Sequence, residues 1–234
     1  MKVTYLGHSG FLVETERAYY LFDYIRGELP VWKDGLSLYV FSSHSHEDHF
    51  CTGIFAPELA ARVTAYILSY DIGKKFRRSR AGWLRGNGER ILWAEPGKKL
   101  ELETCRILPL KSTDLGAAFV VEEEDFCMYH AGDLNWWHWE GEAKAWNRNM
   151  EVNYKREIDR LAGRRMKLAF VPLDPRLGDA YWYGMEYFLR TVSAEAVFPM
   201  HFWEDYTVIP RYIAEHGTES NIVKIEREGQ QYEI

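Results

Sequence analysis

The chain has 234 residues, of which 47% are apolar and 27% charged, and its formal net charge is −6. This composition is typical of a folded globular protein, and the acidic balance argues against a broad nucleic-acid-binding surface. No apolar run approaches the roughly 18 residues of a membrane-spanning helix, and no Pro- or Ser-rich linker divides the chain. We therefore expect a single domain over residues 1–234, with no membrane and no nucleic acid as partner.

The first half of the chain is rich in β-forming residues separated by turn-like residues, which predicts strands and hairpins. Leu38–Phe41 is apolar throughout, as expected of a strand that is covered on both faces. Pro57–Tyr66 begins with helical character and passes into a strand. The other expected strands are Val3–Leu6, Gly10–Glu14, Tyr19–Asp23, Val63–Leu68, Arg90–Ala94, Lys99–Glu103 and Arg106–Leu110.

The second half alternates helices and strands. Apolar residues recur at helical intervals from Trp146 to Leu161, and this helix is expected to end near Gly163. The remaining expected elements are a strand at Leu168–Leu173, a helix at Tyr183–Thr191, a strand at Val197–Met200, a helix at Tyr206–His216 and a strand at Ile222–Glu226.

A cluster of potential metal ligands follows the strand at Leu38–Phe41. Residues 44–49 read His-Ser-His-Glu-Asp-His. In an extended chain, His44 and His46 project to the same side, and a turn after them lets Asp48 and His49 face the same point. Imidazole nitrogens and carboxylate oxygens are ligands of zinc and related divalent metals. Without a metal, protonated histidines so close together would repel one another, so the sequence predicts a metal site.

This segment, His44-x-His46-x-Asp48-His49, resembles the signature of the metallo-β-lactamase superfamily. Further segments that resemble the superfamily follow in the expected order. GHSGF (Gly7–Phe11) and LFDY (Leu21–Tyr24) resemble the branch of lactonase-like and uncharacterised zinc-dependent hydrolases, HAGDLN contains Asp133, and FPMH ends in His201. The resemblance implies an α/β (α+β) fold, a four-layer αββα sandwich of two mixed β-sheets with helices on the outer faces.

The resemblance also implies a function, that of a metal-dependent hydrolase. A metal-bound hydroxide formed near neutral pH would attack a small ester, lactone or phosphodiester-type substrate. Asp48 would be catalytic, orienting the water while remaining a ligand. The implied ligands are His44 and His46 in one site, Asp48, His49 and His201 in the other, and Asp133 shared between them. One or two ions are expected, with Zn²⁺ as first choice and Mn²⁺ or Fe²⁺ as alternatives, because His and Asp suit all three.

Two alternative functions share this fold: a non-catalytic metal-binding sensor or scaffold, and a nuclease. The sensor is favoured by a departure from the superfamily pattern. Another histidine normally follows the strand here placed at Arg106–Leu110, but this sequence has Lys-Ser-Thr-Asp at 111–114. Three consequences stay open. Asp114 replaces the ligand, the first site is empty, or Lys111 points inward and its ammonium stands in for a cation, although a surface position is the default for lysine.

Five other residues are candidates for contacting the substrate or a metal ligand. His8 follows the first strand, and either contacts the site or makes a structural hydrogen bond. Asp23 is a candidate for orienting a ligand histidine. Trp136 begins an aromatic run that forms either a cleft wall or core. Arg176 either pairs with a substrate phosphate or carboxylate or lies in a surface turn, and Trp203 is expected to line the pocket beside His201.

The three cysteines suggest the compartment. Their number is odd, and no pair has metal-ligand spacing. This pattern fits a reducing cytoplasm better than a disulfide framework. The first residues have the pattern of a strand and lack the apolar segment of a signal peptide. We therefore expect a cytoplasmic protein with a small-molecule substrate, and the sequence is compatible with a homo-oligomer.

Overall fold

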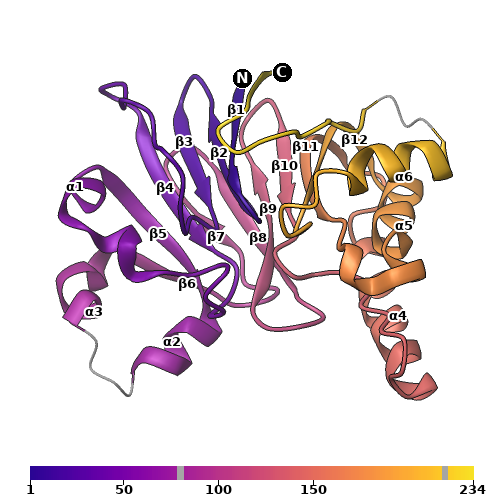
Figure 1. The fold of residues 1–234 in the computed structure, drawn as a ribbon. Helices are drawn as coiled ribbons and strands as arrows, with labels where there is room; N and C mark the ends of the chain where they lie inside the picture. Colours follow the sequence, from indigo (N-terminus) through magenta and orange to yellow (C-terminus); the bar gives the residue numbers. More distant parts are fainter. Residues whose placement is uncertain (78–81, 218–220) are drawn as a thin grey trace.

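The computed structural model describes residues 1–77, 82–217 and 221–234. In these ranges two β-sheets, one of seven strands and one of six, pack face to face. Helices cover the outer side of each sheet, so the layers run helix, sheet, sheet, helix (Figure 1). The predicted four-layer αββα sandwich is therefore confirmed. The two termini lie side by side, and the N-terminal amine of Met1 donates a hydrogen bond to the carbonyl of Ile234.

The first sheet is built mainly from the first part of the chain, and the second sheet from the later part. In spatial order, the first sheet contains β13 (Gln231–Glu233), β1 (Lys2–Gly7), β2 (Gly10–Glu14), β3 (Ala18–Phe22), β4 (Ser37–Ser42), β5 (Val63–Ser69) and β6 (Ile91–Ala94). The second contains β12 (Ser193–Met200), β11 (Arg165–Pro172), β10 (Cys127–His130), β9 (Ala117–Glu122), β8 (Arg106–Lys111) and β7 (Leu100–Glu101).

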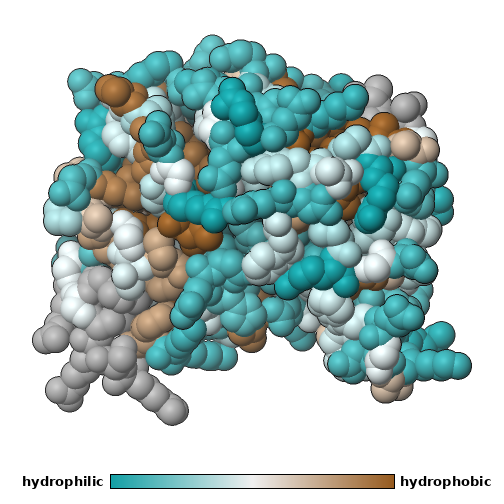
Figure 2. Space-filling model, viewed as in Figure 1, coloured by the Kyte–Doolittle hydropathy of each residue, from teal (hydrophilic) through white to brown (hydrophobic). Residues whose placement is uncertain are grey.

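The helices divide between the two outer faces (Figure 1). Those beside the first sheet are α1 (Pro57–Ala60), α2 (Tyr70–Arg77) and α3 (Gly82–Asn87). Those beside the second are α4 (Lys144–Asp159), α5 (Tyr183–Thr191) and α6 (Val208–His216). Short 3₁₀ turns are η1 (Thr52–Phe55), η2 (Gly88–Arg90) and η3 (Pro175–Ala180). In the described ranges no helix is both long enough and apolar enough to span a bilayer. The face in Figure 2 is mainly hydrophilic, with smaller hydrophobic areas.

The apolar strands are explained by burial on both faces of the sheets. In β2, Phe11 and Val13 belong to the core between the sheets, whereas Leu12 belongs to the core beneath the helices beside the first sheet. Successive side chains of a strand point to opposite faces, so a sheet inside a sandwich needs apolar residues at almost every position. This is why β2 and its neighbours lack the polar alternation of a half-exposed strand.

Two strand predictions need correction. The segment predicted as a strand at Ile222–Glu226 forms only one parallel bridge, between Ile222 and Val197. Ile222 and Ile225 are both buried, and a spacing of three does not fit the two-residue period of a strand. The predicted strand Lys99–Glu103 is shortened to β7. The other expected strands and helices are present with small shifts of their ends.

Candidate metal centre

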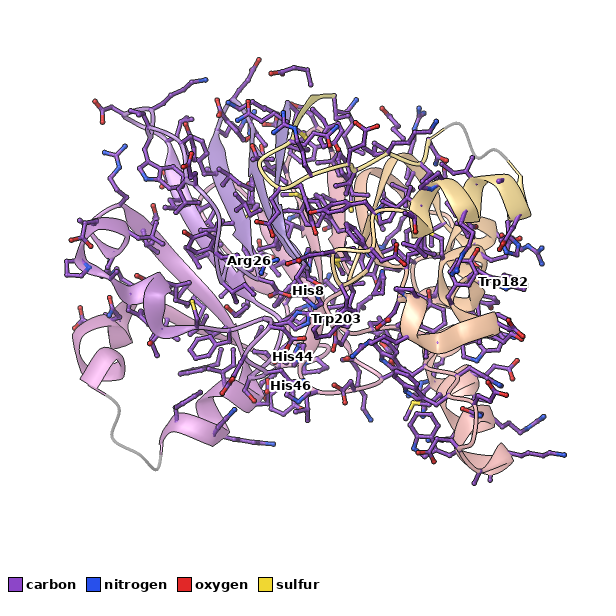
Figure 3. All side chains as sticks on the ribbon, viewed as in Figure 1. His8, Arg26, His44, His46, Trp182 and Trp203 are labelled. Carbon is purple, nitrogen blue, oxygen red and sulfur yellow. The ribbon has the colours of Figure 1, made fainter. Side chains whose placement is uncertain are left out.

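Loops at one edge of the sandwich bring the predicted metal ligands together. His8 lies in the turn between β1 and β2, and His44 and His46 lie in the loop after β4. Asp133 follows β10, and His201 follows β12. Figure 3 shows His8, His44, His46 and Trp203 gathered between the two halves of the molecule. The two sheets are tied at this edge by the amide of Ala117, which donates to the carbonyl of Ser43 at 2.9 Å.

The ligand-type side chains form two groups. In the described part of the chain, each group offers four atoms that lie within 4.8 Å of one another. We call the first the deep group, and its members are His8, Asp48, His49 and His201. We call the second the outer group, and its members are His44, His46, Asp114 and Asp133. The division follows the one implied by the sequence, with His8 and Asp114 added.

Asp133 lies between the two groups. Its Oδ1 is 3.1 Å from Nε2 of His49 and 3.3 Å from Nε2 of His201. Its Oδ2 is 3.4 Å from Nε2 of His44 in the outer group. Oδ1 therefore faces the deep group and Oδ2 faces the outer group. A carboxylate in this position could be shared between ions in the two groups.

Four atoms at this point are buried and have no hydrogen-bond partner among the described residues. They are Nε2 of His8, Nε2 of His49, Nε2 of His201 and Oδ1 of Asp133. The contacts of 3.1–3.3 Å between these nitrogens and the nearby carboxylates are close ion pairs that lack hydrogen-bond geometry. A buried polar atom without a partner costs roughly 1–3 kcal/mol. A divalent cation would satisfy all four atoms, so the donor set fits a metal.

The opposite nitrogens of two of these rings are held by buried carboxylates. Nδ1 of His49 donates to Asp23 at 2.7 Å, and Nδ1 of His201 donates to Asp174 at 3.0 Å. Both carboxylates are fully buried. Such a bond fixes which nitrogen carries the proton and leaves Nε2 free to bind a metal.

Two of the histidines could bind a cation without first losing a proton. Burial and the neighbouring His49 lower the pKa of His44 to about 4, and burial lowers the pKa of His8. Both rings are therefore neutral at pH 7, the form that binds metals. Burial opposes ionisation of Asp133, but the charges of His49 and His201 hold its pKa well below the usual range. Burial and the charge of Asp133 raise the pKa of Asp114.

Comparison with known proteins identifies the fold. No protein-family model matches the chain. The structure is similar to that of a metallo hydrolase from Ignicoccus hospitalis, with a TM-score of 0.61 and 18% sequence identity. The alignment covers 100% of this chain and 98% of the Ignicoccus chain. A metallo-β-lactamase fold protein of Bacillus subtilis, 14% identical, covers 99% of both chains with a TM-score of 0.58. The chain has the metallo-β-lactamase fold.

A curated metal-dependent hydrolase of Opitutus terrae is similar in sequence. It is 33% identical over 148 residues, which cover 57% of this chain and 63% of the relative. The chain thus spans about three fifths of the length of the curated relatives that it matches.

Asp114 lies where the metallo-β-lactamase pattern lacks its histidine. Its Oδ2 is 3.6 Å from Nδ1 of His46, whose ring also lies 2.9 Å from Nε2 of His44. The side chains of Asp114 and His46 are 42% and 44% exposed. The outer group is therefore open to solvent, in contrast to the buried histidines of the deep group.

Lys111 does not enter the site, so the alternative in which its ammonium replaces a cation is wrong. It is exposed and lines a hollow next to the cleft, with Arg156 and Glu157. Lys111 ends β8, where it pairs with Ala117. Its neighbour Leu110 is buried, and alternation along the strand sends the lysine side chain outward.

A cleft of about 340 Å³ opens beside the two groups. Its polar lining consists of His46, Asp48, Thr113, Asp114, Asp133, Arg176 and His201. Its apolar lining, which we call the tryptophan wall, consists of Trp137, Trp139, Trp146, Met150 and Trp203. Trp203 is thus at the cleft, as expected from the sequence, and Arg176 takes the cleft position of the two that the sequence left open.

The placement of Trp136 is corrected by the structure. This side chain is outside the cleft lining and instead packs on Tyr183, with ring centroids 5.1 Å apart. Trp137 and Trp139 line the cleft in its place. Trp146 and Met150 were missed as wall residues, although their spacing of four on α4 indicates a common helix face.

Replacing Asp23 with asparagine is expected to weaken zinc binding roughly 10–100-fold. Asp23 accepts hydrogen bonds from His49 Nδ1, from the hydroxyl of Ser43 and from the amide of Ser43, each at 2.7 Å. The amide of asparagine keeps the shape but replaces one acceptor oxygen by a donor. Competition with a chromophoric zinc chelator measures the affinity, and equal affinities for both proteins would show that Asp23 does not orient His49.

Proposed function

We propose that this protein is a metal-dependent hydrolase with one or two divalent ions at the edge of its metallo-β-lactamase fold. The observation that carries the proposal is the convergence of four buried, unpartnered donor atoms from His8, His49, His201 and Asp133. The curated relative of Opitutus terrae, named a metal-dependent hydrolase, supports the same activity.

The two groups would hold the ions in different surroundings. The deep group, with Asp133, would hold the first ion, and His44, His46, Asp114 and Asp133 would hold the second. Zn²⁺ is the first choice for such nitrogen and oxygen donors, and Mn²⁺ or Fe²⁺ would also fit them. A bound ion would supply a nucleophile at neutral pH by lowering the pKa of water, and would polarise the substrate oxygen.

Asp48 is the candidate for moving the proton. Burial opposes its ionisation, but the neighbouring His8 and His49 lower the pKa of its carboxyl. The side chain is 29% exposed and lines the cleft. An ionised carboxylate here can orient the attacking water and accept its proton, which is then returned to the leaving oxygen as the ester, lactone or phosphodiester bond breaks.

We propose further that residues 1–234 act as one domain on a small molecule in the cytoplasm. One core of buried residues extends between the two sheets and beneath α4–α6. A cleft of about 340 Å³ is near the lower end of the range for small-molecule sites. Cys51, Cys105 and Cys127 are all free thiols, as expected in a reducing compartment.

Metal content tests this proposal. Untagged protein, purified without chelator, is expected to contain about two divalent transition-metal ions per chain by mass spectrometry. The Asp114→Ala variant is expected to contain about one. Asp34→Ala, at a side chain that is 97% exposed, is the matched control. One ion in both the native protein and Asp114→Ala would leave the outer group without a metal. No ion, even after reloading, would overturn the proposal.

Turnover is tested on a panel of esters, lactones and phosphodiesters. The metal-loaded protein is expected to hydrolyse at least one class, and chelation is expected to abolish this activity. Metal binding without turnover across the panel would favour the sensor or scaffold instead.

A further inference from the structure

The tryptophan wall is built onto the segments that carry the metal ligands. Trp137 and Trp139 follow Asp133 by four and six residues, and Trp203 follows His201 by two. Trp146 comes from the facing surface of α4. The wall is therefore fixed in position relative to the groups that would hold the ions.

The rings continue directly from the metal centre into the cleft. The centroid of Trp137 is 5.5 Å from that of His201, and Trp137 and Trp139 are stacked at 6.2 Å with an interplanar angle of 5°. Trp203 stands perpendicular to His201 at 5.6 Å and is 45% exposed. A flat apolar group on the cleft side of this wall would lie beside the metal centre.

The cleft lining offers one cationic side chain, and that side chain is already paired. Among the described residues that line the cleft, Arg176 is the only lysine or arginine. Its Nε donates to both carboxylate oxygens of Asp174 at 3.0 Å, and its guanidinium lies 4.3 Å from the ring centroid of Trp203. Asp174 is fully buried, so this pair neutralises the cation.

The other charged side chains of the cleft lining are carboxylates, whose charge the proposed ions would offset. Asp48, Asp114 and Asp133 all face the cleft. Lys111 and Arg156 line a neighbouring hollow, which shares Thr113, Asp114 and Met150 with the cleft, and neither lines the cleft itself. An anionic substrate would therefore find no unpaired cationic side chain among the residues that line the cleft, whereas an uncharged aromatic molecule would meet stacking partners.

We propose that the substrate is an uncharged aromatic ester or lactone, whose ring lies against the tryptophan wall. This inference rests on the proposed hydrolase function and narrows it. Water adds to the carbonyl carbon, the acyl C–O bond breaks, and the products are a carboxylic acid and the hydroxyl of the leaving group.

Paired lactones test the proposal in the metal-loaded protein. Dihydrocoumarin and δ-valerolactone share a six-membered lactone, and only the first has a fused benzene ring. Each kcat/KM is divided by the rate constant for hydrolysis by hydroxide, to correct for the better leaving group of dihydrocoumarin. The corrected value is expected to be at least about tenfold higher for dihydrocoumarin.

Variants assign the preference to the wall. Trp139→Ala and Trp146→Ala are expected to lower kcat/KM for dihydrocoumarin roughly tenfold and for δ-valerolactone less than about threefold, whereas Trp139→Phe keeps a ring and the preference. Trp182→Ala is the matched control, since Trp182 lies far from the cleft in Figure 3 and packs on His216. Equal corrected rates for the two lactones, or equal losses in Trp139→Ala, would overturn the proposal.

A binding measurement separates this inference from the hydrolase proposal. The uncharged lactams 3,4-dihydro-2-quinolinone and δ-valerolactam have the shapes of the two lactones, and amides resist hydrolysis. Saturation-transfer NMR with metal-loaded protein is expected to show binding of the quinolinone, weakened in Trp139→Ala. Binding with this pattern but no lactone turnover would contradict the hydrolase alone. Turnover without any preference for the aromatic lactam would contradict the inference alone.

Discussion

Asp133→Asn is expected to lose most of the bound metal and to lower kcat/KM roughly 10³-fold or more. The carboxylate of Asp133 places Oδ1 at 3.1 Å from His49 Nε2 and Oδ2 at 3.4 Å from His44 Nε2. Asparagine has nearly the same shape but lacks the negative charge and one oxygen. Because metal catalysis supplies several kcal/mol of transition-state stabilisation, and each 1.36 kcal/mol is tenfold in rate, a loss of about this size follows.

The measurement pairs metal content with turnover of whichever substrate the panel identifies. Asp34→Asn is the control, because it removes a carboxylate whose exposed ion pair with Arg62 contributes little. Two ions and full activity in Asp133→Asn would show that Asp133 is not shared by the two groups. One ion with partial activity would place Asp133 in a single group.

The sequence predicted which ligand-type side chains lie together where these are close along the chain. His44, His46, Asp48 and His49 lie within six residues, and local geometry alone brings them together. Asp133 and His201 are far apart in the chain, and only the resemblance to the metallo-β-lactamase superfamily linked them to the cluster. The structure places both beside the motif.

What the sequence left open depends on the direction of single side chains. His8 was left between a structural and a functional position, because only the packed turn between β1 and β2 directs its Nε2 at Asp48, 3.3 Å away. Alternation sends Trp136 and Trp137 to opposite sides, and the sequence alone does not reveal which side is the cleft. The strand prediction at Ile222–Glu226 was wrong. Ile222 and Ile225, three residues apart, are both buried in the core, and this packing outweighs the β-propensity of the segment.

Gly116→Ala is expected to destabilise the protein by about 3–5 kcal/mol, because backbone strain and overpacking add. Gly116 has a φ of +72°, and a Cβ there would lie 2.0 Å from the carbonyl oxygen of Ser43 and 2.6 Å from Cβ of His44. That carbonyl accepts the bond from Ala117 that ties the two sheets together. The clash is with the backbone of Ser43 and with the buried His44. Neither can move without displacing the loop that carries His44 and His46.

Gly141→Ala separates the two contributions to this loss. Gly141 also has a positive φ, +91°, but a Cβ there meets nothing within 4 Å among the described residues. It should therefore show only the strain of the left-handed conformation, about 1–2 kcal/mol. Thermal unfolding is expected to shift by roughly 10 °C or more for Gly116→Ala and by a few degrees for Gly141→Ala. Equal shifts would mean that the contact between Gly116 and Ser43 does not hold the two sheets in register at the site, and that the loop after β4 is positioned by the hydrogen bonds of Asp23 to Ser43 instead.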